Sequence, residues 1–210
     1  MSEALIVAVD PDVAGIVRPV SWVAGGVHVI DAHEPLHRAI AAACDTMRMR
    51  AEPPSTLSDT RSMYKRLGID PTKTRPSSEA LWRRIRRGDP FPRVNSLVDI
   101  INWTSLETQL SFGLYDADRI RGAVVLRRGR EDEAYAGIRK DTVHVAGRLA
   151  LVDDEGPFGN PTSDSARTMV TSTATRVLVV IYAPAGLAAG VADRARRLTT
   201  ERLNEFGTLQ

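Results

Sequence analysis

The residues best suited to binding a small molecule lie together between Asp164 and Thr168, in the order Asp-Ser-Ala-Arg-Thr. This segment offers a carboxylate, two hydroxyls and a guanidinium shortly before a predicted strand. Such a set can hold an α-amino acid, because the ligand carboxylate pairs with arginine and its ammonium group pairs with aspartate. The same side chains can equally form a hydrogen-bonded loop that caps a turn or a helix. Both interpretations are consistent with the sequence.

Other groups that often carry chemistry have simpler interpretations. The acidic run from Asp153 to Gly156 can supply a general base or a cation ligand, but a glycine-ended acidic run is more often a solvated turn. His33 and His37 have the spacing of paired metal ligands, yet Pro35 interrupts that span and no third ligand follows, so we expect no metal. Cys44 is interpreted as a small buried apolar residue. Phosphate-loop, dinucleotide-binding and serine-hydrolase motifs are missing from the sequence, and we expect no cofactor.

Positive charge is concentrated between Arg61 and Arg93, where ten Lys or Arg residues stand against three Asp or Glu. The rest of the chain is slightly acidic, so this segment alone is a candidate surface for an anion. A solvated face of arginine-rich helices is the simpler interpretation. Several of these cations flank a Gly/Pro turn, however, and can converge on RNA phosphates or on a carboxylate. The candidate contacts are Arg61, Lys65, Lys73, Arg75 and Arg93.

The bulk properties are those of an ordinary globular protein. With 210 residues, 43% of them apolar and 26% charged, the chain can form one domain over 1–210. One cysteine cannot form an internal disulfide, which indicates a reducing compartment. The N-terminus lacks the basic segment of a secretion signal, and apolar stretches are too short to cross a bilayer. We therefore expect a cytoplasmic protein that contacts no membrane.

Apolar spacing predicts mainly helices in the first half of the chain. The predicted segments are an opening strand at 5–9, a turn at 10–12, a strand or loop at 16–30, and helices at 34–50, 58–67, 76–87 and from 95 onward. Gly25 and Gly26 argue against regular structure near 16–30, and Gly68 is expected to cap the second of these helices. In the helix that begins near 95, a polar stripe of Asn95, Asp99 and Asn102 either lines a pocket or faces water.

Strands dominate the second half. A hairpin is predicted from 123–126 and 135–138, followed by strands at 149–152 and 176–182 and a final helix at 186–206. The run Val177 to Ile181 is apolar at every position, which is typical of a central strand buried on both faces. Helices that precede a mostly antiparallel sheet define an α+β fold.

Three stretches resemble one known family. RSMYKRLGIDPTKTRPSSEALWRRI, then FPRVNSLVDIINWTSLETQLSFGLYDAD, and later RVLVVIYAP are similar to the stand-alone B3/B4 domain proteins, over roughly 60–184. That domain is the editing domain of the phenylalanyl-tRNA synthetase β chain. Within the second stretch, NSLVDIINW resembles the asparagine-rich helix of the editing domain, and Tyr115-Asp116 resembles its phenylalanine-aspartate pair. The resemblance implies the B3/B4 fold.

The synthetase domain hydrolyses tyrosine wrongly attached to the phenylalanine tRNA, so the resemblance implies an aminoacyl-ester deacylase that acts on tRNA. Three positions depart from the pattern. Ile101 stands where the editing domain commonly has threonine, Gly113 stands where it has histidine, and Val180 aligns with the glutamate that reads the tyrosine hydroxyl. An apolar pocket cannot select a hydroxylated substrate. We therefore expect an editing-like hydrolase that is not specific for tyrosine.

The resemblance and the candidate loop together give a predicted pocket without an assigned catalytic residue. Its predicted residues are Asn102, Ser105, Gly113, Tyr115, Asp164, Arg167, Thr168 and Val180. The leading hypothesis is a trans-acting deacylase that removes an amino acid from an aminoacyl-tRNA, with no DNA partner expected. One alternative is a non-catalytic module that binds an amino acid, a metabolite or RNA. Another is an enzyme that acts on a free small molecule derived from an amino acid. The sequence does not fix the oligomeric state.

Overall fold

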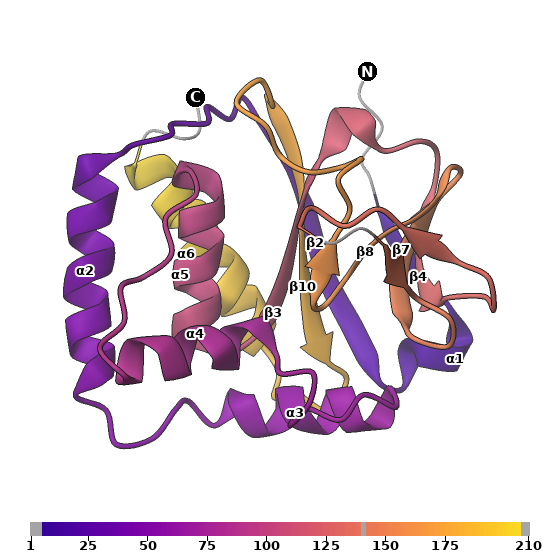
Figure 1. Ribbon diagram of the computed structural model, residues 1–210, viewed down its shortest axis with the longest axis horizontal. Coiled ribbons are helices and arrows are strands. Elements are labelled where there is room, and N and C mark those ends of the chain that lie inside the picture. Colours follow the sequence, from indigo (N-terminus) through magenta and orange to yellow (C-terminus); the bar gives the residue numbers. More distant parts are fainter. Residues whose placement is uncertain (1–5, 140–141, 207–210) are drawn as a thin grey trace.

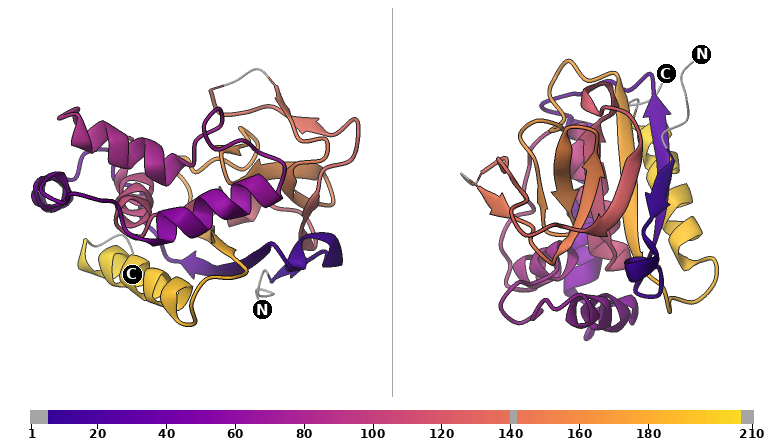
Figure 2. Two further views of the ribbon diagram at one scale, coloured as in Figure 1. Left: turned by 90° about the horizontal axis from the view of Figure 1, so that it is seen from below. Right: turned by 90° about the vertical axis from the view of Figure 1, so that its right-hand side faces the viewer.

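The computed structural model describes residues 6–139 and 142–206. It has an α+β fold, as predicted, in which helices and strand-rich layers lie on opposite sides of a central sheet (Figure 1). The view from below in Figure 2 shows the helical part and the smaller strands side by side. No helix in the described part of the chain has the length and apolar character needed to span a membrane.

The central sheet has three antiparallel strands in the order β2-β10-β3. These are β2 (Val17–Gly25), β10 (Arg176–Pro184) and β3 (Ser111–Asp116). The prediction of a central strand at 176–182 is confirmed. Residues 16–30 contain a nine-residue strand, because Gly25 is only its last residue and Gly26, with φ 68°, starts the turn that follows.

Strand β10 belongs to two cores at once. Its residues Val177, Val179 and Ile181 pack with the helices, whereas Leu178, Val180 and Tyr182 pack between the two sheets. Successive side chains of a strand point to opposite faces, so a strand covered on both faces is apolar at every position. This arrangement explains the uninterrupted apolar run in the sequence.

The second sheet has five strands in the order β1-β4-β7-β8-β9. They are β1 (Val7–Val9), β4 (Val124–Arg128), β7 (Leu149–Asp153), β8 (Gly156–Asn160) and β9 (Ser163–Asp164), and only the β1–β4 pair is parallel. The predicted hairpin of 123–126 with 135–138 is wrong. Strand β4 pairs with β7, which is fully buried and longer than β5. Strand β5 (Ala134–Tyr135) forms a separate ribbon with β6 (Val143–His144).

The helices follow the predicted apolar stripes closely. They are α1 (Pro11–Ala14), α2 (Glu34–Arg48), α3 (Thr56–Arg66), α4 (Ser77–Arg86), α5 (Ser96–Thr108) and α6 (Val191–Glu205), with a 3₁₀ turn at Ala117–Arg119. The turn expected at 10–12 is the start of α1, because the Asp10 side chain accepts from the Asp12 amide and caps that helix. Gly68, with φ 80°, lies just beyond the end of α3 as predicted.

Candidate functional site

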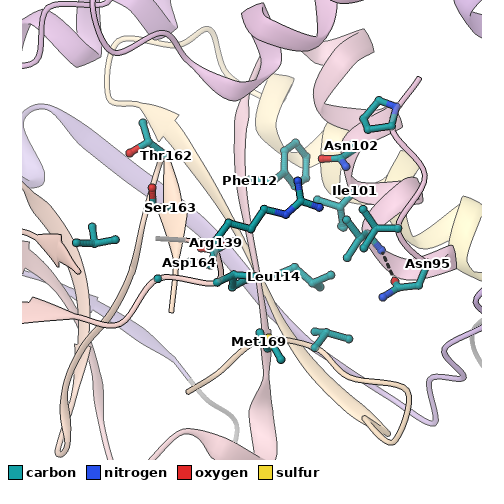
Figure 3. A pocket seen from close by; sticks show the side chains of 17 residues that line it. Asn95, Ile101, Asn102, Phe112, Leu114, Arg139, Thr162, Ser163, Asp164 and Met169 are labelled. Carbon is teal, nitrogen blue, oxygen red and sulfur yellow. Dashed lines mark hydrogen bonds between the residues drawn. The ribbon is translucent and has the colours of Figure 1, made fainter. Parts of the chain in front are cut away.

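A pocket of about 560 Å³ opens beside β3, the edge strand of the central sheet (Figure 3). Helix α5 forms one wall, and the loop before β9 forms the other together with the chain around 137–139. Its apolar lining includes Val98, Ile101, Phe112, Leu114 and Val170. Its polar lining consists of Asn95, Asn102, Arg139, Thr162, Ser163 and Asp164. The pocket is therefore an apolar cleft with polar groups on both sides.

The polar stripe predicted on α5 divides between two environments. Asn95 caps the helix by accepting from the Val98 amide at 3.0 Å, and Asn102 lies two turns later on the same side; both line the pocket. Asp99 is fully buried instead, where it accepts from the Val94 amide at 2.9 Å and lies 3.5 Å from Nε2 of His37. Burial raises the pKa of Asp99. One of the two predicted alternatives, a pocket lining, therefore holds for Asn95 and Asn102.

Asp164 is the most unusual titratable group of the pocket wall. The residue as a whole is half-buried, but its Oδ1 atom is closed off from solvent and has no hydrogen-bond partner among the described residues. Burial raises the pKa of the Asp164 carboxyl to about 7, although a hydrogen bond with the Tyr115 hydroxyl opposes this shift. An unpaired buried oxygen is costly and often marks the place of a ligand or a bound water.

All four tyrosines of the chain hold this wall in place. Tyr64 donates to the Pro161 carbonyl at 3.0 Å, and Tyr135 donates to the Ser163 carbonyl at 2.5 Å. The Tyr115 and Tyr182 hydroxyls lie 2.7 Å apart, and Tyr115 also bonds to the Asp164 carboxyl. Burial raises the pKa of each tyrosine. The four come from distant segments, so no local pattern in the sequence signals that they meet.

The ring of Tyr115 fills the space between two glycines. A Cβ atom added at Gly113 would lie 2.3 Å from the Tyr115 hydroxyl oxygen, and one added at Gly159 would lie at the same distance. Gly113 pairs with Val180 across the sheet. Tyr115 and Val180 are buried between the two sheets. Phe112 and Leu114, which belong to β3 like Tyr115, line the pocket on the other face.

The remaining predicted pocket residues make internal contacts. Ser105 donates to the Leu110 carbonyl at 2.7 Å, and the hydroxyl of Thr168 lies 3.1 Å from that of Ser165. Arg167 makes two hydrogen bonds to Asp153, at 2.8 and 3.0 Å. Of the eight predicted residues, Asn102 and Asp164 line this pocket. The other six, Ser105, Gly113, Tyr115, Arg167, Thr168 and Val180, are not among its lining residues.

The segment from Asp164 to Thr168 therefore does not bring its own carboxylate and guanidinium to one ligand. Arg167 lies 3.2 Å from Glu155 as well as being bonded to Asp153, so one carboxylate at the end of β7 and one in the turn that follows hold it. This geometry is that of the hydrogen-bonded loop, the second predicted interpretation. Arg139, which the sequence did not single out, lines the pocket instead and reaches across it toward Asn102 in Figure 3.

The predicted basic contacts separate into two groups. Arg61 and Arg75 lie 3.5 and 3.6 Å from the buried carboxylate of Glu79, which also binds Arg83. The side chains of the other three, Lys65, Lys73 and Arg93, form no hydrogen bond or ion pair with a residue in 6–139 or 142–206. Cys44 is buried as predicted, and burial raises the pKa of its thiol to about 11.

The sequence places the chain in a known family. A sequence model of the B3/4 domain matches residues 59–206, so the chain belongs to the B3/4 domain family, which confirms the resemblance. It is 34% identical over 62 residues to the phenylalanine–tRNA ligase β subunit of Neisseria gonorrhoeae, covering 30% of this chain and 8% of that protein. The identity to the same subunit of Cutibacterium acnes is 29% over 106 residues, covering 50% of this chain and 12% of that protein.

The fold has a counterpart among solved structures. An N-terminal fragment of the phenylalanyl-tRNA synthetase β-subunit from Pyrococcus horikoshii superposes with a TM-score of 0.52 over 96% of this chain and 48% of that fragment, at 14% sequence identity. The chain spans only about a tenth of the length of the curated relatives that it matches, between 8% and 12%.

Proposed function

We propose that this protein is a trans-acting hydrolase that removes an amino acid from an aminoacyl-tRNA, with the aminoacyl group bound in the pocket beside β3. The observation that carries this proposal is the unpaired, buried Oδ1 of Asp164 in the wall of a mostly apolar cleft. Membership of the B3/4 domain family and the names of the relatives support a tRNA-linked substrate.

The pocket walls favour an apolar amino acid. Ile101, Phe112 and Leu114 present hydrocarbon to the ligand, and the part of the pocket that these three side chains form offers no partner for a phenol hydroxyl. A site without such a partner gains little from a hydroxylated substrate and pays to desolvate the hydroxyl. We therefore expect a preference for aliphatic or unsubstituted aromatic amino acids over tyrosine.

Asp164 is proposed as the general base. A water molecule attacks the ester carbonyl carbon, its proton passes to the Asp164 carboxylate, and the bond to the ribose oxygen breaks as that oxygen receives a proton. A carboxyl group with a pKa near 7 is suited to both transfers at neutral pH. Asn102, on the α5 side in Figure 3, is proposed to hold the ester or the ribose through its amide.

The test is release of amino acid from a panel of aminoacyl-tRNAs, including mismatched pairs, by the natural chain and by Asp164→Asn. Asparagine has nearly the same shape and can still accept from Tyr115, so the fold should persist. We expect hydrolysis of a subset of apolar esters and a loss of at least about 100-fold in Asp164→Asn. The rate should rise with pH and level off above about 7. Equal rates for the two proteins would refute the assignment of Asp164.

A binding module for a free amino acid is the second candidate, and Arg139 favours it. A free amino acid carries a carboxylate that the ester lacks, and Arg139 lines the same pocket as Asp164. Arginine and aspartate can pair with the two charged ends of such a ligand. A rise in melting temperature with free leucine or phenylalanine that disappears in Arg139→Gln, without hydrolysis of any ester, would support this candidate over the hydrolase.

A further inference from the structure

Three arginines from three segments converge on one buried carboxylate at the α3–α4 side of the fold. Glu79 on α4 is only 2% exposed. Its Oε1 atom accepts from Nε of Arg83 at 2.9 Å and from Nη1 of Arg61 at 3.5 Å, and it lies 3.6 Å from Nε of Arg75. Arg61 belongs to α3, and Arg75 belongs to the connection between α3 and α4.

One carboxylate cannot satisfy this cluster. Three positive charges face one negative charge, and all three contacts are made to the same oxygen of Glu79. The terminal guanidinium nitrogens of Arg75 and Arg83 make no hydrogen bond to any residue that the structure describes. The side chains of Arg61, Arg75 and Arg83 remain 33%, 40% and 50% exposed. Glu79 thus holds several unused donors at the surface in a fixed arrangement.

The positive surface continues along α3. Arg61 and Lys65 are one turn apart on the same side of that helix. Lys65 and Lys73 both lie near Asp70: hydrogen bonds from Thr72 lower the pKa of Asp70 most, and the charges of the two lysines add to the effect. The strip therefore holds five cations against two carboxylates.

Neighbouring arginines near the end of α4 already bind other groups of the protein. Arg87 forms an ion pair with Asp89 at 2.8 Å, and Arg84 donates to the Pro90 carbonyl at 2.5 Å. Arg86 bonds to backbone carbonyls at the end of α2 and lies over the Trp82 ring, 6.0 Å from its centroid. Arg84, Arg86 and Arg87 are thus engaged away from Glu79, whereas Arg61, Arg75 and Arg83 are held together by its carboxylate.

We propose that Arg61, Arg75 and Arg83 form a phosphate-binding site for the backbone of RNA, with Lys65 and Lys73 contacting adjacent phosphates. Guanidinium groups bind phosphate oxygens through paired N–H donors. A strip of fixed cations suits a polymer with repeated charges better than one small carboxylate. The choice of RNA among phosphate-bearing ligands rests on the proposed function; the anion site itself does not.

The test is binding of tRNA that carries no amino acid, over a series of KCl concentrations. Each lost phosphate contact lowers the slope of log K against log salt by about 1. We expect this decrease for Arg75→Gln and for Arg83→Gln, and a decrease of about 2 for the double variant. Arg87→Gln, at the C-cap of α4 and paired with Asp89, is the matched control and should keep the natural slope. Slopes equal to that of the control would overturn the proposal.

Two further measurements separate the possible failures. Melting temperatures establish that the single variants fold, which is expected because two arginines still face Glu79 in each. Inorganic phosphate at constant ionic strength tests the source of the ligand: stabilisation that depends on Arg75, without any effect of the variants on tRNA binding, would overturn the assignment to RNA. The tRNA used here carries no aminoacyl ester, so the binding result is independent of whether the pocket hydrolyses such an ester.

Discussion

Replacing Gly113 by alanine tests whether the Tyr115 ring is fixed in one position by its neighbours. The new Cβ would lie 2.3 Å from the phenol oxygen and 2.7 Å from two ring carbons, distances at which one of the groups must move. Gly159 closes the other face of the ring equally tightly, and the Tyr182 hydroxyl holds the phenol at 2.7 Å. The ring therefore cannot shift without breaking a buried hydrogen bond.

The expected cost combines two effects. Overpacking of a buried site typically costs about 1–3 kcal/mol, and leaving a buried hydroxyl unpaired costs a further 1–3 kcal/mol, so we expect Gly113→Ala to lower the free energy of unfolding by about 3 kcal/mol. Urea denaturation measures this change. Gly186→Ala is the matched control, because its added Cβ meets no atom within 4 Å, and it should change stability by less than about 0.5 kcal/mol.

A double-mutant cycle shows whether the clash is with Tyr115 itself. In a Tyr115→Leu background the phenol is gone, so Gly113→Ala should cost much less than in the natural chain. If Gly113→Ala is as mild as Gly186→Ala, or if its cost is the same in both backgrounds, the reasoning about the ring is refuted.

Three other perturbations follow from buried polar groups. Because the pKa of Asp164 is raised, the folded state binds the carboxyl proton more tightly than the unfolded state does. The protonated carboxyl therefore contributes fully to stability below pH 3.8, and this contribution decreases as pH rises to about 7. Asp164→Asn should remove this part of the pH dependence in denaturation curves. Arg202 is buried over the Trp103 ring and bonded to Glu107 and Thr104, so Arg202→Met should cost about 3 kcal/mol by removing these buried bonds. The exposed control Arg196→Met should cost below about 1 kcal/mol. Tyr64→Phe removes the hydroxyl that donates to the Pro161 carbonyl at 3.0 Å. The free energy of unfolding, measured by calorimetry, should fall by about 1–2 kcal/mol.

The helices and the central strand could be predicted because each carries its own periodic pattern. Apolar residues at steps of three and four mark α2, and the apolar run of β10 reflects burial on both faces. The pairing of β4 was not predictable in this way. Its apolar, β-branched run indicates a strand, but the choice between β5 and β7 as partner depends on which of them completes the core.

The pocket was predictable only in part for a related reason. Asn102 and Asp164 were found from the α5 stripe and from the candidate loop, and both line the pocket. Tyr115 and Val180 were placed there by alignment to a resembling domain, yet strand alternation turns them to the opposite face of the central sheet from Phe112. Which face of a strand borders a cavity depends on the register of the whole sheet.

The pairing of β2 with β10 has a consequence for how the chain folds. Val17 pairs with Pro184, and Gly25 pairs with Arg176, so a strand near the start of the chain meets one near its end. Contacts this distant in sequence slow folding, because a long loop must close before they form. During synthesis β2 has no strand partner among the described residues until β10 has been made. The final closure of this strand, which buries both cores around β10, is therefore the step at which we expect folding to be slowest and aggregation most competitive.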